Sequence, residues 1–386
     1  MTTKASLNRR EFMRVAAAGV AGGFLSAGMH KGWSTDLNGV PKSRLDRLAK
    51  GANVCRWFCF SKQEGPGHFG NYIGDPEASQ MREMGLTHVR LCIQPKVLMD
   101  QSTGAVRAET AGFVQAAIAR FHKADLMVVI DLHNEDRASE LDSAWQEAFA
   151  RFWGELATRL KRFDPELTML EIINEPVFKG READWNTFNV RLASTIRKNA
   201  PEHTIMTSGA NWGGIDGLRK LTLLEDPNVV YSFHCYDPFT FTHQGATWSG
   251  PDVKPLRKVP YPSNPEVVAP LLSDLAQYPG SKKMLENYGN QRWDKAKLAA
   301  RFKEGIEWGA RNKVPLYCGE FGVFPPYVQA EHRANWFRDF GQVLAENQIG
   351  WAVWGWDEGF GLNRSYKDGK PEIDQTVAAS LGLKTV

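Results

Sequence analysis

Short apolar or β-branched runs recur along the chain, and each ends in polar or aromatic residues. Most of them are followed by a segment whose apolar residues recur with helical spacing. Eight runs can be counted, at 52–58, 87–93, 127–133, 169–174, 204–208, 229–236, 315–321 and 350–356. The helical pattern is clearest at 144–162, 183–198, 295–311 and 331–346. Such alternation favours a parallel sheet with helices outside it.

Eight strand–helix units that close on themselves predict a single-domain (β/α)8 TIM barrel. A doubly wound open sheet is the alternative, but no GxGxxG turn follows the first run and no Walker lysine motif is present. No low-complexity linker divides the chain. The segment 237–294 is unusually long for a connection and is rich in Pro, Gly and aromatic residues. Connections of that length are usually functional.

The N-terminus carries Arg9-Arg10, then Phe12 and an apolar run over 15–25. This pattern resembles a twin-arginine export signal, so we expect a periplasmic or secreted protein. We assign residues 1–30 to the signal peptide, 31–50 to a lead-in segment and 51–386 to the folded domain. No A-x-A triplet ends the apolar run cleanly, so an uncleaved membrane anchor stays open. No other apolar stretch reaches 18 residues, which excludes a multi-span membrane protein.

Composition narrows the class of partner. The chain has 386 residues, 42% apolar and 24% charged, which is typical of a soluble globular protein. A net charge of +3 gives no electrostatic footprint for nucleic acid or an anionic membrane, so a neutral partner is favoured. Many of the 13 Trp residues fall in candidate loops, where an indole can stack on a sugar. The five cysteines lack the CxxC spacing of a zinc site, and we interpret them mainly as buried thiols.

In a barrel of this type the active site lies at the C-terminal ends of the strands. The residues that close the predicted strands are Arg90, His133, Asn174, Glu175, Asn211, Trp212, His234, Tyr236, Glu320 and Trp354. Glu175 and Glu320 both end apolar strands, where a carboxylate is costly unless it is paired or used. Two carboxylates across one barrel mouth supply the acid and the nucleophile that glycoside hydrolysis needs. The alternative is a structural pair of charges tied to Arg90 or a histidine.

Residues 50–360 strongly resemble glycoside hydrolase family 5, the cellulase-type retaining β-glycosidases. The motifs occur in the family's order: Val89-Arg90-Leu91, Asp131-Leu132-His133-Asn134, Asn174-Glu175-Pro176, His234-Cys235-Tyr236, Gly319-Glu320-Phe321-Gly322 and Trp351-Ala352-Val353-Trp354. Tyr usually precedes the last Trp in the family, whereas Val353 stands here. The resemblance implies that Glu175 is the acid/base and Glu320 the nucleophile.

The resemblance also implies roles for the residues around these two glutamates. Asn174 would hydrogen-bond the 2-hydroxyl of the sugar at the cleavage site, and Arg90 with Tyr236 would hold Glu320 ionised. His133 and His234 would line the cleavage subsite.

Four groups of aromatic residues complete the expected cleft. Trp354 would form the stacking floor of the cleavage subsite, Trp212 would stack the leaving-group sugar, and Trp57 would stack a sugar on the other side. Trp248, Tyr261 and Trp293 in the long connection would either extend the cleft or bury the connection against the barrel.

Two other functions compete with this one. A metal-dependent barrel hydrolase could use His133, His234 and carboxylates as ligands, but it would want a His-x-His pair or a HExxH helix, and neither is present. A non-catalytic carbohydrate-binding barrel would be expected to lose one carboxylate. We therefore expect a monomeric endo-β-1,4-glucanase that needs no cofactor and no metal and acts on a neutral β-linked oligo- or polysaccharide. A β-mannanase and an exo-acting β-glucosidase remain alternatives.

Overall fold

The computed structural model describes residues 39–357, 359–367 and 370–385. The candidate export signal and the first part of the lead-in segment lie outside the described residues. Trp33–Val386 form one compact unit. Among the described residues, no helix is long and apolar enough to cross a membrane.

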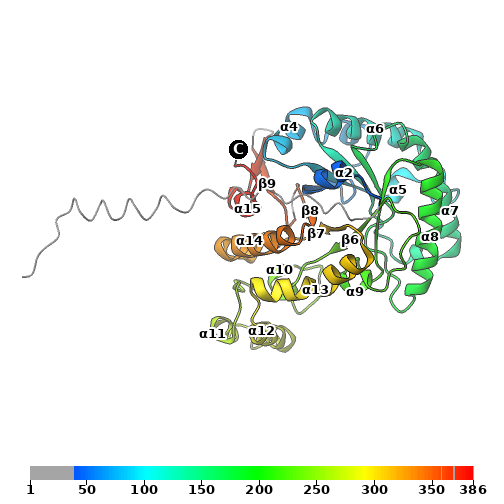
Figure 1. The fold of residues 1–386 in the computed structure, drawn as a ribbon. Helices are drawn as coiled ribbons and strands as arrows, with labels where there is room; N and C mark the ends of the chain where they lie inside the picture. Colours follow the sequence, from blue (N-terminus) through cyan, green and yellow to red (C-terminus); the bar gives the residue numbers. More distant parts are fainter. Residues whose placement is uncertain (1–38, 358, 368–369, 386) are drawn as a thin grey trace, which may run out of the picture. The chain divides into compact units, whose positions relative to one another are not determined.

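Eight parallel strands form a closed barrel in sequence order, in which β1 also pairs with β8 (Figure 1). They are β1 (Lys50–Phe58), β2 (His88–Ile93), β3 (Met127–Leu132), β4 (Thr168–Glu171), β5 (Thr204–Ser208), β6 (Val229–His234), β7 (Leu316–Glu320) and β8 (Gly350–Val353). The predicted (β/α)8 barrel is confirmed, and the open sheet is wrong. Both faces of these strands are buried, which explains why their sequences read as continuous apolar runs.

Helices surround the barrel. The long ones are α6 (Ala108–Lys123), α7 (Ser143–Leu160), α8 (Glu182–Asn199), α12 (Pro279–Gln291), α13 (Lys295–Asn312) and α14 (Ala330–Glu346). The shorter ones are α2 (Lys42–Arg47), α3 (Pro66–Asn71), α4 (Asp75–Glu83), α5 (Pro95–Leu98), η1 (Ser139–Leu141), α9 (Ile215–Leu218), α10 (Phe239–Thr242), α11 (Pro265–Val268), η2 (Ala269–Leu271), η3 (Pro325–Tyr327) and α15 (Gln375–Ser380). The four helices expected from spacing appear as α7, α8, α13 and α14.

Alternation along the strands sorts side chains between the barrel interior and the helix layer. In β2, Val89, Leu91 and Ile93 pack into the large outer core, whereas Arg90 points into the barrel. The barrel interior is apolar toward the N-terminal ends of the strands. The apolar cluster there contains Met127, Val129, Met169, Met206, Val230, Tyr317 and Ala352. Leu45 and Leu48, on and just after α2, join this cluster. The last part of the lead-in segment therefore closes the end of the barrel opposite the strand ends.

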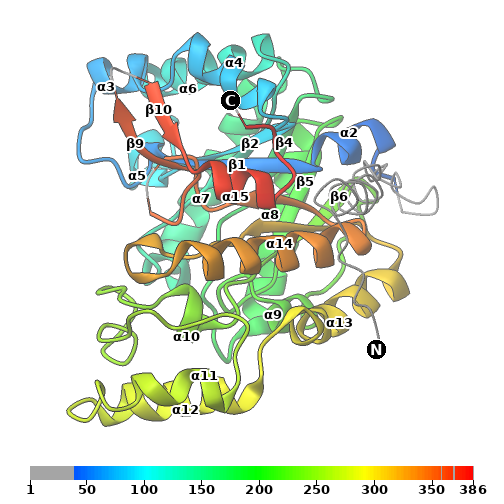
Figure 2. The ribbon, with the colours of Figure 1, turned by 90° about the vertical axis from the view of Figure 1, so that its left-hand side faces the viewer.

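The long connection 237–294 contains α10, α11, η2 and α12, and α11 and α12 lie outside the ring of helices in both views (Figures 1 and 2). Tyr261 and Trp293 are buried, so these two aromatics bury the connection rather than extend a cleft. Trp248 instead is 61% exposed. The five cysteines are buried and free, as expected.

A small antiparallel hairpin near the C-terminus, which the sequence pattern did not predict, is made of β9 (Asn363–Lys367) and β10 (Lys370–Ile373). The hairpin lies near α3 and α4 in Figure 2. The hydroxyl of Tyr366 donates a 2.7 Å hydrogen bond to Glu77 of α4. Trp356, which follows β8, donates from its indole to the same carboxylate. One carboxylate on α4 thus accepts hydrogen bonds both from the hairpin and from the segment after β8.

Candidate active site

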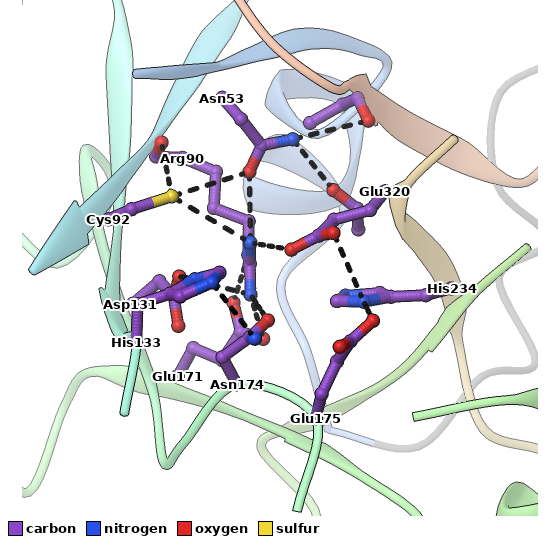
Figure 3. Close-up of polar contacts among 12 residues, drawn as sticks. Asn53, Arg90, Cys92, Asp131, His133, Glu171, Asn174, Glu175, His234 and Glu320 are labelled. Atoms are coloured by element: carbon purple, nitrogen blue, oxygen red, sulfur yellow. Dashed lines mark hydrogen bonds and ion pairs between the residues drawn. The ribbon is translucent and has the colours of Figure 1, made fainter. Parts of the chain in front are cut away.

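Arg90 lies at the centre of the barrel mouth and is fully buried (Figure 3). Its guanidinium donates two hydrogen bonds to Glu171, at 2.6 and 2.9 Å, and one to Glu320 at 2.8 Å. It also donates to the side-chain oxygens of Asn53 and Asn174, at 2.9 and 2.8 Å. One planar cation therefore joins groups from β1, β2, β4 and β7 and from the turn after β4.

The pairing of β2, β3 and β4 explains why the charges of Arg90, Asp131 and Glu171 meet at the barrel mouth. Cys92 pairs with Asp131 across β2 and β3, and Asp131 pairs with Glu171 across β3 and β4. Asp131 lies 3.2 Å from Arg90. Burial alone would lower the pKa of Arg90, but the carboxylates of Asp131, Glu171 and Glu320 raise it well above its usual value. Arg90 is thus a permanent cation beneath the two candidate catalytic carboxylates.

Glu320 is the last residue of β7, and donors from β2 and from the segment just after β6 reach it. Arg90 donates to one carboxylate oxygen at 2.8 Å, and the hydroxyl of Tyr236 donates to the other at 3.0 Å. Burial and the charge of Glu320 raise the pKa of Tyr236 well above its usual value, so the phenol keeps its proton. Both donors favour the ionised form of Glu320.

Glu175 lies beyond the end of β4, in a turn where its own φ is +42°. Its carboxylate lies 2.8 Å from Nδ1 of His234, and the same nitrogen lies 3.6 Å from Glu320. One carboxylate oxygen each of Glu175 and Glu320 and a ring nitrogen of His234 lie within 4.8 Å of one another. This agrees with the short carboxylate separation expected for a retaining glycosidase.

Burial raises the pKa of both Glu175 and Glu320 to about 7. For Glu320 the nearby charge of Glu175 adds to that rise, so Arg90 and Tyr236 do not by themselves keep its pKa low. Burial lowers the pKa of His234 to about 4, so its ring is neutral near pH 7. Two carboxylates this close share one proton near neutrality. The fixed donors face Glu320, an arrangement that favours the proton on Glu175.

The remaining predicted residues of the cleavage subsite also converge on the mouth. Nδ1 of His133 lies 2.8 Å from Asp131, and Nε2 lies 3.2 Å from the amide of Asn174. The His133 ring stacks on Trp354, with centroids 5.4 Å apart. Phe60, which follows β1, lies edge-on to both rings and is 43% exposed. Sequence reasoning missed Phe60, although its place after the first predicted strand was a usable signal.

The two outer tryptophans, Trp212 and Trp57, differ in their exposure to solvent. Trp212 is 55% exposed and lies under the guanidinium of Arg137, 5.5 Å from the ring centroid. Trp57, in contrast, is 1% exposed, and its indole donates to the backbone oxygen of Phe69. A register shift in β1 between Val54 and Phe58 turns Trp57 away from the mouth. The prediction that Trp57 stacks a sugar is therefore wrong.

Sequence reasoning assigned no role to the polar residues beneath the carboxylates. Asn53, Asp131 and Glu171 occupy inward positions of apolar strands, and each contacts Arg90. A charged residue at an inward position was the signal that could have found them. Arg137, in the loop after β3, had no such signal.

Within the described part of the chain, two clusters have the residue types and spacing of a metal site. The first is Glu175, His234 and Glu320, but donors from Arg90 and Tyr236 already occupy both oxygens of Glu320. The second is Cys92, Asp131 and His133, beside the same guanidinium. A permanent cation within 3.2 Å of a ligand oxygen disfavours a second cation there. The donor arrangement therefore fits acid–base chemistry better than metal binding.

Comparisons with known proteins fit this geometry. The family described as Cellulase (glycosyl hydrolase family 5) matches residues 49–359. Endoglucanase C of Acetivibrio thermocellus is 29% identical over 314 residues, which cover 79% of this chain and 88% of that protein. Thermotoga maritima Cel5A in complex with cellobiose is 26% identical, with a TM-score of 0.72 over 88% of this chain and 98% of that one. The same enzyme in complex with mannotriose is 25% identical, with a TM-score of 0.71.

Proposed function

The chain belongs to glycosyl hydrolase family 5, and on that premise we propose that this glycoside hydrolase cleaves internal β-1,4 bonds of a glucan with retention of configuration. The observation that carries the proposal is the pair of carboxylates, Glu175 and Glu320, within 4.8 Å of each other at the barrel mouth. Inverting enzymes separate their carboxylates by about 6.5 to 9.5 Å to admit a water molecule.

In the first step Glu320 attacks the anomeric carbon while Glu175 gives its proton to the glycosidic oxygen. The bond between that carbon and oxygen breaks, and the leaving sugar departs as a neutral alcohol. The products are a glycosyl ester on Glu320 and an ionised Glu175. The unequal surroundings of the two carboxylates support this division of labour, because only Glu320 has a fixed cation and a phenol as donors.

In the second step Glu175 acts as a base. It takes a proton from a water molecule, whose oxygen attacks the anomeric carbon and releases Glu320 as a carboxylate. Two displacements on the same carbon leave the product in the β configuration. The neutral ring of His234 lies between the two carboxylates and adds no charge that would fix the proton on either one.

The neighbouring residues would orient the sugar. We assign the 2-hydroxyl contact to Asn174, whose amide nitrogen keeps one hydrogen beyond its contact with His133. Trp354 would stack the sugar at the cleavage site, and Trp212 would stack the leaving-group sugar. Phe60, instead of Trp57, would stack the sugar on the other side of the cleavage site, since it is exposed beside Trp354.

The substrate is tested with the protein alone and soluble β-glucan, β-mannan and β-xylan. We expect glucan cleaved to oligomers of mixed length, with β products in NMR spectra recorded before mutarotation. Products of the α configuration would overturn the mechanism, and release of single sugars only would replace the endo assignment by an exo one. Mannan is the second candidate because Thermotoga maritima Cel5A is known in complex with mannotriose.

Export is a separate proposal and depends on Arg9-Arg10 and the apolar run that follows. Replacement of both arginines by lysine should leave active enzyme in the cytoplasm of a host with a twin-arginine pathway. Replacement of Lys4 by arginine serves as the control, because it exchanges one basic residue for another outside the pair. Unchanged export of the double variant would contradict the proposal.

A further inference from the structure

Arg137 lies in the loop between β3 and η1, and its side chain is mostly buried. Its guanidinium donates to the backbone oxygens of Asn174 and Glu175, at 2.7 and 3.2 Å. The second terminal nitrogen lies 3.9 Å from the carboxylate of Glu175. Arg137 therefore contacts both the backbone and the side chain of one residue.

The backbone at this point needs support. Glu175 has φ of +42°, a conformation that is uncommon for a residue with a side chain and that persists where the surroundings hold it. The strand has already ended at Glu171, so the oxygens of Asn174 and Glu175 lie beyond the β4 ladder. The two bonds from Arg137 satisfy them with a charged donor.

A buried carboxylate completes this support. Glu140 is almost fully buried and accepts hydrogen bonds from the backbone nitrogen of Val177 at 3.0 Å and from Arg137 at 3.3 Å. Asn134 donates to the same carboxylate at 3.2 Å. The loop after β3 thus holds the turn 174–177 at both ends.

The same guanidinium reaches the candidate leaving-group surface. It lies 5.5 Å from the ring centroid of Trp212, within the range of a cation–π contact. The backbone nitrogen of Trp212 donates to the oxygen of Pro176, in the turn that Arg137 supports. Trp212 itself has φ of +62°. The acid/base turn and the exposed indole are therefore linked by one side chain.

We propose that Arg137 is a positioning residue, which holds the turn 174–177 so that Glu175 faces the glycosidic oxygen and which supports Trp212 beneath the leaving-group sugar. The inference deepens the proposed function and rests on Glu175 as the acid. Neither the family motifs nor the strand pattern of the sequence points to this residue.

The charge of Arg137 has a second effect, on the proton of Glu175. The ionisable groups that face Glu175 are Arg137 from the β3 loop, Arg90 on β2, Asp131 on β3, Glu171 on β4, His234 on β6, Tyr236 just after β6 and Glu320 on β7. Burial raises the pKa of Glu175, and Arg137 and Arg90 oppose that rise. Loss of Arg137 should therefore raise this pKa further. Because the acid works protonated, the alkaline limb of the rate should move to higher pH.

The test compares two substrates, cellotetraose and 2,4-dinitrophenyl β-cellobioside, whose leaving group needs no proton. In Arg137→Met we expect kcat/KM on cellotetraose to fall about 30-fold, as general acid catalysis is impaired. On the dinitrophenyl substrate the loss in kcat/KM should stay below about fivefold, since kcat/KM reports the first step and this leaving group departs without a proton. The alkaline limb on cellotetraose should move upward. Arg181→Met is the matched control, because Arg181 is an exposed arginine in the loop after β4 that pairs with Asp184.

Arg137→Lys separates the two roles of the side chain. It keeps the charge but not the planar fork, so cellotetraose turnover should fall while the alkaline limb stays near that of the unmutated enzyme. The lysine variant also serves if the methionine variant fails to fold. Equal losses on both substrates with an unmoved pH profile would overturn the inference and leave Arg137 a general structural residue. If Glu175→Gln shows no dependence on the leaving group, the proposed function fails instead.

Discussion

The ends of β7 and β4 present the same side chain in two different settings. Glu320 closes its strand, and side chains on β2 and just after β6 fix both of its oxygens. Glu175 lies in a left-handed turn beyond its strand, beside a neutral imidazole and at the edge of a guanidinium 3.9 Å away. Burial raises the pKa of each to about 7, so burial does not distinguish them.

The difference lies in the hydrogen bonds. A carboxylate that accepts from a permanent cation and a phenol is stabilised in its ionised form and held in one orientation, as a nucleophile requires. A carboxyl group with a neutral neighbour can give and take a proton without losing a strong ion pair, as an acid/base requires. The following experiments separate these two settings.

Glu320→Ala should give the largest loss, about 10⁵-fold in kcat, because removal of a nucleophile abolishes the covalent step. Azide should restore turnover of the dinitrophenyl substrate, because the small anion attacks from the face that Glu320 occupied. The product should be the α-glycosyl azide, which NMR identifies. A β-azide from this variant would reverse the assignment of the two glutamates.

Glu175→Ala should lower kcat/KM on cellotetraose by about 10³-fold, within the range of a lost general acid. The loss should shrink on the dinitrophenyl substrate, on which the acid is not needed for the first step. Azide should intercept the glycosyl ester on Glu320 in place of water and give the β-glycosyl azide. A loss of equal size on both substrates would mean that Glu175 has a structural role and is not the general acid.

Tyr236→Phe should cost about tenfold to 100-fold in kcat, the usual worth of a hydrogen bond to a charged group. The lost donor stabilised the ionised form of Glu320, so the pKa of Glu320 should rise. Glu320 works ionised, and the acidic limb of the bell-shaped pH profile should therefore move to higher pH while the alkaline limb, set by Glu175, stays in place. Movement of the alkaline limb alone would show that the phenol acts on Glu175. Tyr72→Phe controls for the loss of a buried phenol elsewhere.

The same division between strand and loop decides what could be predicted from the sequence. The strands were located to within a few residues because a barrel strand is buried on both faces and reads as an apolar run. Glu320 was found because a charge that ends such a run is conspicuous. The Asn174-Glu175-Pro176 motif marked Glu175, but nothing in it indicates a left-handed φ or the support from Arg137.

Whether an aromatic side chain is buried or exposed could not be predicted from the sequence in this way. Strict alternation from Asn53 through Cys55 would put Trp57 inside the barrel, and only the register shift in β1 sends it outward. Tyr261 and Trp293 face the interior of the long connection, whereas Trp248 faces solvent, yet all three lie in similarly polar sequence. Burial in a loop depends on contacts between distant segments, which local pattern does not contain.

Trp248→Ala should give the smallest effect and shows whether a loop aromatic can serve the site at a distance. A series of ring contacts leads from Tyr236 to Phe360 at 5.4 Å, to Phe324 at 5.8 Å and to Trp248 at 4.7 Å. Because Trp248 is exposed at the end of this series, we expect it to stack a distant sugar of a long chain. Loss of one aromatic contact should lower kcat/KM on polymeric glucan by about threefold to tenfold and leave cellotriose turnover unchanged. Tyr278→Ala, an exposed aromatic of the same segment, is the matched control. An equal loss on cellotriose would mean that Trp248 supports Phe324 and the barrel mouth. This aromatic residue would then contribute only to packing, unlike the groups that bind Glu320.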